Sequence, residues 1–502
     1  METETVQATE EAIDLKRFLS SMRLNPEVEA PVPMIREGME LSDGNMREED
    51  RFLSGLAALL LNVDTSQPGK FDKSAILNLI AQIDRTVTAQ VNEVMHHAKF
   101  QALESSWRGL DDIIRNTNFR ANVMIDILDV SKAELFDDLD SNAVDIMGSA
   151  MFKKLYLAEY DQFGGKPYGG VVGLYEFKHT PTDELFLKVM SKVSAASHAP
   201  FISSVSPEFF GCESIEELAA IKDLEGLLSH PKYSSWNALR DTPEAAYLGL
   251  TLPRYVLRLP WDPVTNPVPG GFNFKEEVRG DVDGEYLWGN AAVLFAKNMI
   301  RSFQESGWCQ YLRGPKGGGQ VSGLPVHTFN LRGEDEIKIP VEMVIPDFRE
   351  LEFANSGFMP LVYRKGTGDA CFFSAQSIKK AKAFKDPKDN ENAQLATNLS
   401  YTLSITRLAH YVKCIMRDNI GSSADANYIQ QSLETWIYQY VTTITNPDDL
   451  TLRYYPFKAA TVEVVERPGM IGWYDCKIGV LPHIQFEGMD VELRLDARLG
   501  SK

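Results

Sequence analysis

The sequence has few cysteines and no spacing typical of a bound metal. The five are Cys212, Cys309, Cys371, Cys414 and Cys476, an odd number with no CxxC pair among them. A disulfide framework or a zinc site needs paired or clustered ligands. We therefore expect no disulfides and no structural metal, and we interpret the cysteines as reduced, mostly buried small hydrophobes.

Long apolar runs and an excess of positive charge are also absent. The longest apolar run, residues 52–63, is interrupted by Ser54 and Gly55 and falls short of the roughly 20 residues that span a bilayer. The first residues include Glu2 and Glu4 where a secretory signal would be basic, so we expect a cytoplasmic protein without a membrane-inserted segment. With 70 acidic and 51 basic side chains, the net charge of −19 disfavours nucleic-acid binding.

Catalytic motifs are missing as well: there is no GxSxG, HExxH or cysteine-centred nucleophile pattern. The glycine-rich segment 314–323 has glycines at 317, 319 and 323, which do not form GxGxxG, and no Lys-Ser or Lys-Thr pair completes a Walker A loop. We therefore favour the interpretation that these glycines allow backbone conformations that are costly for other residues. The alternative hypothesis is a cytoplasmic α/β enzyme that binds a phosphorylated ligand through residues 314–323.

Residues 281–285 contain alternating carboxylates that resemble part of a calcium loop. Tyr286 occupies the position that requires glycine, and Val293 stands where the final glutamate belongs. A polar turn is the simpler interpretation. We expect no catalytic residue, no cofactor and no metal ligand in this chain.

A chain of 502 residues with 44% hydrophobic residues predicts several folded units. We predict four regions: an acidic N-terminal arm with an amphipathic helix (1–65), a long helical segment (66–119), a central mixed α/β domain (120–385) and a C-terminal domain (386–502). In the second region the apolar spacing over 74–116 predicts one long helix, or two helices broken near Ser105.

The central region alternates short apolar runs with helical patterns, which predicts a mixed α/β or α+β fold. Strands are expected at 123–128, 169–175, 201–205, 292–295 and 339–345, and helices at 133–139, 182–196 and 215–228. In the C-terminal region, helices are expected at 395–415 and 425–444. Alternation at 461–466, 474–485 and 490–496 then predicts a small terminal sheet.

Two features suggest binding to other chains. The first is a short helix whose apolar face has the spacing of a groove-binding peptide, formed by Ile13, Leu15, Phe18, Leu19 and Met22. The second is a strand that could pair with a neighbouring sheet edge through Val491, Leu493 and Leu495. The alternatives are a helix docked on its own domain and an ordinary intramolecular strand.

Several long segments together resemble one protein family. They are FQALESSWRGL at 100–110, YGGVVGLYEF at 168–177, YLWGNAA at 286–292, GGGQVSGLPVHTF at 317–329 and RLAHYV at 407–412. In this order they resemble the large subunit of the contractile sheath of bacterial type VI secretion systems, the TssC/VipB type, which is related to phage tail sheath proteins. The resemblance extends from about residue 75 to the end.

The resemblance implies a structural protein with a phage-tail-sheath-like core and no catalytic residues. It implies a heterodimer with a small sheath subunit, polymerisation with further copies into a helical sheath around an inner tube protein, attachment to a baseplate, and contraction that propels the tube. It also implies that the C-terminal sheet is completed by neighbouring chains. The helix at 13–22 would be read by an AAA+ ATPase that disassembles contracted sheaths.

Overall fold

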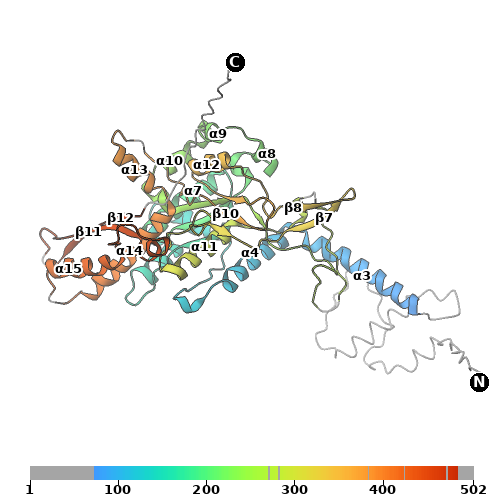
Figure 1. Cartoon of the computed structure of the whole chain (residues 1–502), viewed down its shortest axis with the longest axis horizontal. Helices are drawn as coiled ribbons and strands as arrows, with labels where there is room; N and C mark the ends of the chain where they lie inside the picture. Colours follow the sequence, from blue (N-terminus) through green and yellow to red (C-terminus); the bar gives the residue numbers. More distant parts are fainter. Residues whose placement is uncertain are drawn as a thin grey trace, which may run out of the picture. The chain divides into compact units, whose positions relative to one another are not determined.

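The computed structural model describes residues 73–269, 272–280, 283–382, 384–422, 424–470 and 473–483 (Figure 1). The chain divides into two compact units, residues 1–97 with 260–277 and residues 98–259 with 278–502. The predicted helix with Ile13, Leu15, Phe18, Leu19 and Met22 lies outside the described residues, as does the predicted strand with Val491, Leu493 and Leu495.

The helical region after residue 72 forms two helices, α3 (Lys73–Met95) and α4 (Ala98–Arg115). The break falls at His96 and His97, so the prediction of an uninterrupted helix or of a break near Ser105 was wrong. Ser105 lies inside α4, where its hydroxyl donates a hydrogen bond to the carbonyl of Trp288 at 2.8 Å. A hydroxyl bonded in this way does not interrupt the helix, which is why the residue type misled the prediction.

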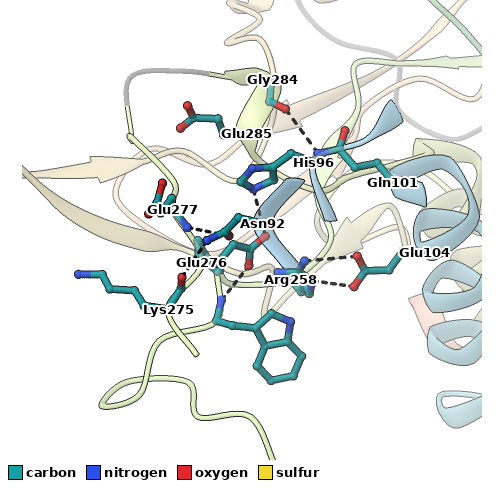
Figure 2. Close-up of polar contacts among 12 residues, drawn as sticks. Asn92, His96, Gln101, Glu104, Arg258, Lys275, Glu276, Glu277, Gly284 and Glu285 are labelled. Atoms are coloured by element: carbon teal, nitrogen blue, oxygen red, sulfur yellow. Dashed lines mark hydrogen bonds and ion pairs between the residues drawn. The ribbon is translucent and has the colours of Figure 1, made fainter. Parts of the chain in front are cut away.

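In the smaller unit, residues 275–277 lie against the end of α3 (Figure 2). The buried Asn92 donates from Nδ2 to the carbonyl of Lys275 at 3.3 Å, and its Oδ1 accepts from the amide of Glu277 at 3.1 Å. Between them, the buried carboxylate of Glu276 lies 3.6 Å from Nε2 of His96. One side-chain amide thus satisfies two backbone groups and fixes this segment on the helix.

A six-stranded sheet organises the larger unit, with the order β1-β2-β3-β9-β10-β6. The first four strands in that order pair in parallel, and β10 pairs antiparallel with both β9 and β6. The strands are β1 (Val171–Phe177), β2 (Phe201–Val205), β3 (Leu248–Leu252), β9 (Met359–Tyr363), β10 (Ala370–Phe372) and β6 (Gln320–Val321).

Both faces of this sheet are covered, because adjacent residues of β2 belong to different apolar clusters. Phe201 packs in the cluster of α7 (Pro181–Ser197), whereas Ile202 packs in that of α11 (Ala291–Ser306). Successive strand side chains point to opposite faces, so the two helices lie on opposite sides of the sheet. The predicted mixed α/β fold is confirmed.

The other helices of the larger unit are mostly short. They are α5 (Lys132–Ser141), α6 (Ala150–Phe152), a π-helix (Lys153–Tyr160), α8 (Ile215–Ala220), α9 (Leu224–Leu228), α10 (Ser234–Arg240), α12 (Asp347–Asn355), α13 (Pro387–Leu395), α14 (Leu399–Asp418), α15 (Ala426–Ile437) and α16 (Asp449–Tyr454). Three antiparallel pairs join β4 (Tyr255–Val256) to β5 (Trp288–Gly289), β7 (His327–Leu331) to β8 (Glu334–Lys338), and β11 (Phe457–Glu466) to β12 (Tyr474–Pro482).

Three predicted strands are not strands. Residues 292–295 lie in α11, because a short apolar run buried on all sides cannot be assigned to strand or helix by periodicity alone. Residues 339–345 contribute only an isolated bridge from Val341 to Tyr255. Residues 123–128 form neither a helix nor a strand. The predicted helix at 215–228 is divided into α8 and α9.

Candidate assembly interface

The C-terminal hairpin has one buried face. β11 and β12 pair antiparallel from Ala459 opposite Leu481 to Glu466 opposite Tyr474. Alternate residues of β11, namely Ala460, Val462 and Val464, are buried against α15. Inward residues of both strands are apolar and most outward residues are polar, and this alternation produces an amphipathic sheet. It confirms the predicted strand at 461–466 and, over residues 474–482, the strand predicted at 474–485.

The opposite face and one edge of the hairpin are open. Val465 is 51% exposed, and Trp473, which directly precedes β12, is 59% exposed. The start of β11 is bridged in parallel by Val441, whose neighbour Thr442 donates its amide to the carbonyl of Phe457 at 2.9 Å. Within the described residues β12 pairs only with β11, so its outer edge is free to accept another strand.

Aromatic side chains fasten the hairpin to the rest of the larger unit. The buried Trp308, which directly follows α11, stands edge-on to Tyr440 and to Phe457 at ring-centroid distances of 5.2 and 5.3 Å. Close by, the side-chain amide of Gln310 donates to the carbonyl of His483 at 3.2 Å. Figure 1 shows α14, α15, β11 and β12 gathered in one region, and Trp308 belongs to the same apolar cluster as residues of these four elements.

A second anchor joins α14 to the end of α7. The imidazole of His410 is buried, and its Nε2 lies 3.2 Å from the carbonyl of Ser197. Burial lowers the pKa of His410 to about 4, and the positive charges of Arg407 and Lys413 act in the same direction. The imidazole is therefore neutral at physiological pH, so Nε2 carries the proton when it donates to this carbonyl.

The glycine-rich segment is closely packed and its amides are already used. Gly314 and Gly318 have φ values of +68° and +88°, and a Cβ on Gly319 would lie 2.3 Å from the carbonyl oxygen of Phe372. The amide of Gly314 donates to that carbonyl at 2.7 Å, while the amide of Gly319 donates to the carbonyl of Gly314 at 2.8 Å. These contacts support a conformational role for the glycines. Both amides already donate to backbone carbonyls, so neither is available to bind a phosphate.

Backbone carbonyls of the same segment accept hydrogen bonds from an arginine side chain. The guanidinium of Arg301 donates to the carbonyls of Gly318 and Gln320 at 2.6 and 2.8 Å. Asn298, one turn earlier on α11, donates to the carbonyl of Gly319 at 3.1 Å. The loop is thus tied to α11 through its own backbone, which is the arrangement of a structural junction.

The other candidate sites do not assemble into a reaction centre in the described part of the chain. No group of three His, Cys, Asp or Glu side chains suited to a metal ion is found there. Glu285 of the acidic turn pairs instead with Arg279 at 2.7 Å. Burial raises the pKa of the Cys371 thiol to about 12, so the thiol is protonated and unreactive at neutral pH.

The two binding features predicted from sequence cannot be placed, because both lie outside the described residues. Sequence reasoning did not find the anchor formed by Trp308. It also did not predict the β7–β8 hairpin.

Among the helices that the structure describes, none is long and apolar enough to cross a membrane.

Comparison with known proteins identifies the family. The chain matches the models "EvpB/VC_A0108, tail sheath N-terminal domain" over residues 77–379 and "EvpB/VC_A0108, tail sheath gpW/gp25-like domain" over residues 388–499. It is 44% identical over 430 residues to the "Type VI secretion system sheath protein TssC1" of Pseudomonas aeruginosa, a match that covers 85% of this chain and 86% of the relative.

Two solved structures of the anti-feeding prophage are more distantly similar. The baseplate has a TM-score of 0.37 at 11% identity, covering 75% of this chain and 84% of that chain. The contracted helical sheath has a TM-score of 0.31 at 12% identity, covering 63% and 68% respectively. Both scores are low, and the assignment depends on the sequence matches alone. From these matches, the chain belongs to the family of type VI secretion system sheath proteins, which are structural proteins and not enzymes.

Proposed function

We propose that this chain is the large sheath subunit, which pairs with a small sheath subunit and polymerises with further copies into a helical tube. The tube surrounds an inner tube protein, stands on a baseplate and contracts to propel the inner tube outward. The observation that carries the proposal is the C-terminal hairpin, which is buried on one face and unpaired along β12 in the described part of the chain. Such an edge suits main-chain pairing between subunits.

Contraction in this account is a change between two packings of rigid bodies. Strands shared between subunits keep their backbone hydrogen bonds while the bodies that carry them reorient. The anchor at Trp308 supports this role, because a shared strand transmits force only if its sheet is fixed to the body. The strand with Val491, Leu493 and Leu495 is the segment that we propose to cross to a neighbouring chain.

We further propose that the helix at residues 13–22 is the recognition signal for an AAA+ ATPase that recycles contracted sheaths in the cytoplasm. Its apolar face, with Leu15 and Phe18, would fill a groove of the ATPase. We propose a separate role for each of the four regions predicted from sequence, 1–65, 66–119, 120–385 and 386–502. They separate the recognition arm, the helical segment, the sheath core and the strand-exchanging domain.

Electron microscopy of the chain coexpressed with its small partner tests the proposal. Replacing Val491, Leu493 and Leu495 by lysine is expected to abolish tubes, because these alternate positions share one face of the strand. The matched control replaces the intervening Glu492, Arg494 and Asp496 by alanine and is expected to retain tubes. Tubes of normal width from the lysine variant would reject strand exchange at this segment.

A further inference from the structure

One side of α4 carries a row of apolar side chains that are open to solvent. Leu103 and Trp107 are 56% and 61% exposed, and Phe100 and Ile114 are each 38% exposed. Together with the half-buried Leu110, they recur at intervals of three and four residues along the helix. Residues with this spacing share one side of a helix. We call this row the α4 stripe, and its members are Phe100, Leu103, Trp107, Leu110 and Ile114.

The opposite side of α4 makes the contacts with the rest of the larger unit. Gly109 is buried there, and a Cβ on it would lie 3.0 Å from Cγ2 of Val293 on α11. Ser105 on the same side donates its hydroxyl to the carbonyl of Trp288. Gly109 and Trp107 lie roughly 160° apart around the helix axis. The apolar stripe therefore faces away from the contacts that hold α4 in place.

The spacing of the α4 stripe suits one kind of occupant, a second helix. Apolar residues at alternating intervals of three and four are the contact positions of paired helices. Large apolar side chains gathered on a surface are typical of an interaction site. A stripe along the whole of α4 therefore favours a helix that carries the same spacing.

The sequence contains such a segment among the residues outside the described part of the chain. Residues 52–63 include no charged side chain. Four of them recur at intervals of three, four and three, namely Leu53, Leu56, Leu60 and Val63. This spacing predicts one apolar side of a helix, and a helix of this length is marginal in water unless it packs on another surface.

We propose that residues 53–63 of a second copy of this chain pack as a helix on the α4 stripe. The inference rests on the proposed function, since it names one contact through which copies of the chain polymerise. The contact joins two different surfaces, the segment of one copy and the stripe of the next. Contacts of this kind repeat without closing into a dimer, which suits a helical polymer.

The same segment of the same copy fits the α4 stripe less well. α3 separates the segment from α4 along the chain, and its 23 residues make it about 34 Å long. The link from Val63 to Lys73 spans at most about 35 Å when it is fully extended. It would have to run almost fully extended along all of α3 to bring the segment to the start of α4, whereas a second copy needs no such extension.

Cysteine crosslinking between two differently substituted chains tests the contact. One full-length chain carries Leu60→Cys and the other Trp107→Cys, and both are coexpressed with the small sheath subunit and treated with a bismaleimide. Trp107 is the central position of the stripe, so a centred helix places Leu60 close to it in either direction. A covalent dimer of the two chains is expected. Each variant alone, and Leu60→Cys paired with Val144→Cys at a fully exposed apolar residue, should not give this dimer.

The outcomes separate the inference from the proposed function. If tubes form and the dimer linked through residues 60 and 107 does not, the inference fails while the proposed function stands. A link found only within a chain that carries both cysteines would show docking inside one copy and would also overturn the inference. If neither tubes nor the dimer form, both fail.

Charged variants provide a second, independent measurement. Trp107→Glu buries a carboxylate against the apolar segment and is expected to reduce the yield of tubes at least about tenfold. Adding Leu60→Lys to the same chain is expected to restore tubes, because the two introduced charges attract each other. Val144→Glu is the matched control and should leave the yield unchanged. A normal yield of tubes from Trp107→Glu would overturn the inference.

Discussion

Removal of the Trp308 ring tests how the C-terminal hairpin is anchored. Trp308 is 3% exposed and contacts Tyr440 and Phe457 edge-on. Replacing a buried tryptophan by alanine costs about 3 to 5 kcal/mol through lost burial and the cavity that remains. The lost aromatic pairs are part of that cost, at about 0.5 to 1.5 kcal/mol each. We therefore expect Trp308→Ala to loosen the hairpin while the six-stranded sheet keeps its structure.

Hydrogen exchange resolves the two regions in one experiment. Amides of β11 are expected to lose protection by a factor corresponding to several kcal/mol, whereas those of β2 change little. Trp107→Ala provides the control, because Trp107 is 61% exposed and its replacement is expected to cost less than about 1 kcal/mol. Unchanged protection of β11 in Trp308→Ala would refute the anchoring role.

Three further predictions concern other parts of the chain. His410 stays neutral in the folded chain down to about pH 4, whereas an unfolded imidazole protonates below about pH 6.5. The unfolded state therefore binds more protons between these values, so stability falls as the pH falls. His410 is expected to contribute about 2 kcal/mol to the loss of stability between pH 7 and pH 5, and in denaturant titrations this contribution should be absent from His410→Gln. Gly319→Ala places a Cβ against the Phe372 carbonyl and is expected to lower the melting temperature, while nucleotide-binding screens stay negative for wild type and variant; saturable binding lost in the variant would revive the phosphate hypothesis. Replacing Leu15 and Phe18 by Asp should spare tubes but weaken ATPase binding, each lost contact being worth about 1.5 to 3 kcal/mol, whereas Lys16→Ala and Ser20→Ala should not.

The elements that sequence predicts well are those in which one face is buried and the other exposed. β11, α7 and α15 have such periodic patterns, so the spacing of their apolar residues along the sequence predicts where they lie. The apolar run at 292–295 gives no period, because α11 is buried between α4 and the sheet, and tertiary contacts decide its structure. The helix break at His96 and His97 was also not predictable, because no glycine or proline occurs there in the sequence.

The interface was predictable only in part. The alternation in β11 and β12 indicated a small sheet, but which edge stays open depends on the Val441 bridge, a contact between segments 16 residues apart. Residues 123–128 have strand-forming composition and yet form no ladder within the described chain. Their prediction as a strand considered only this polypeptide, whereas pairing in a sheet depends on a second backbone.

Negative-stain electron microscopy of the chain coexpressed with its small sheath partner tests the central claim most directly. Hollow tubes of uniform width that contain both subunits are the predicted result. Stable monomers of this chain beside an unbound small subunit, with no tubes at any concentration examined, would contradict the assignment of a structural sheath subunit.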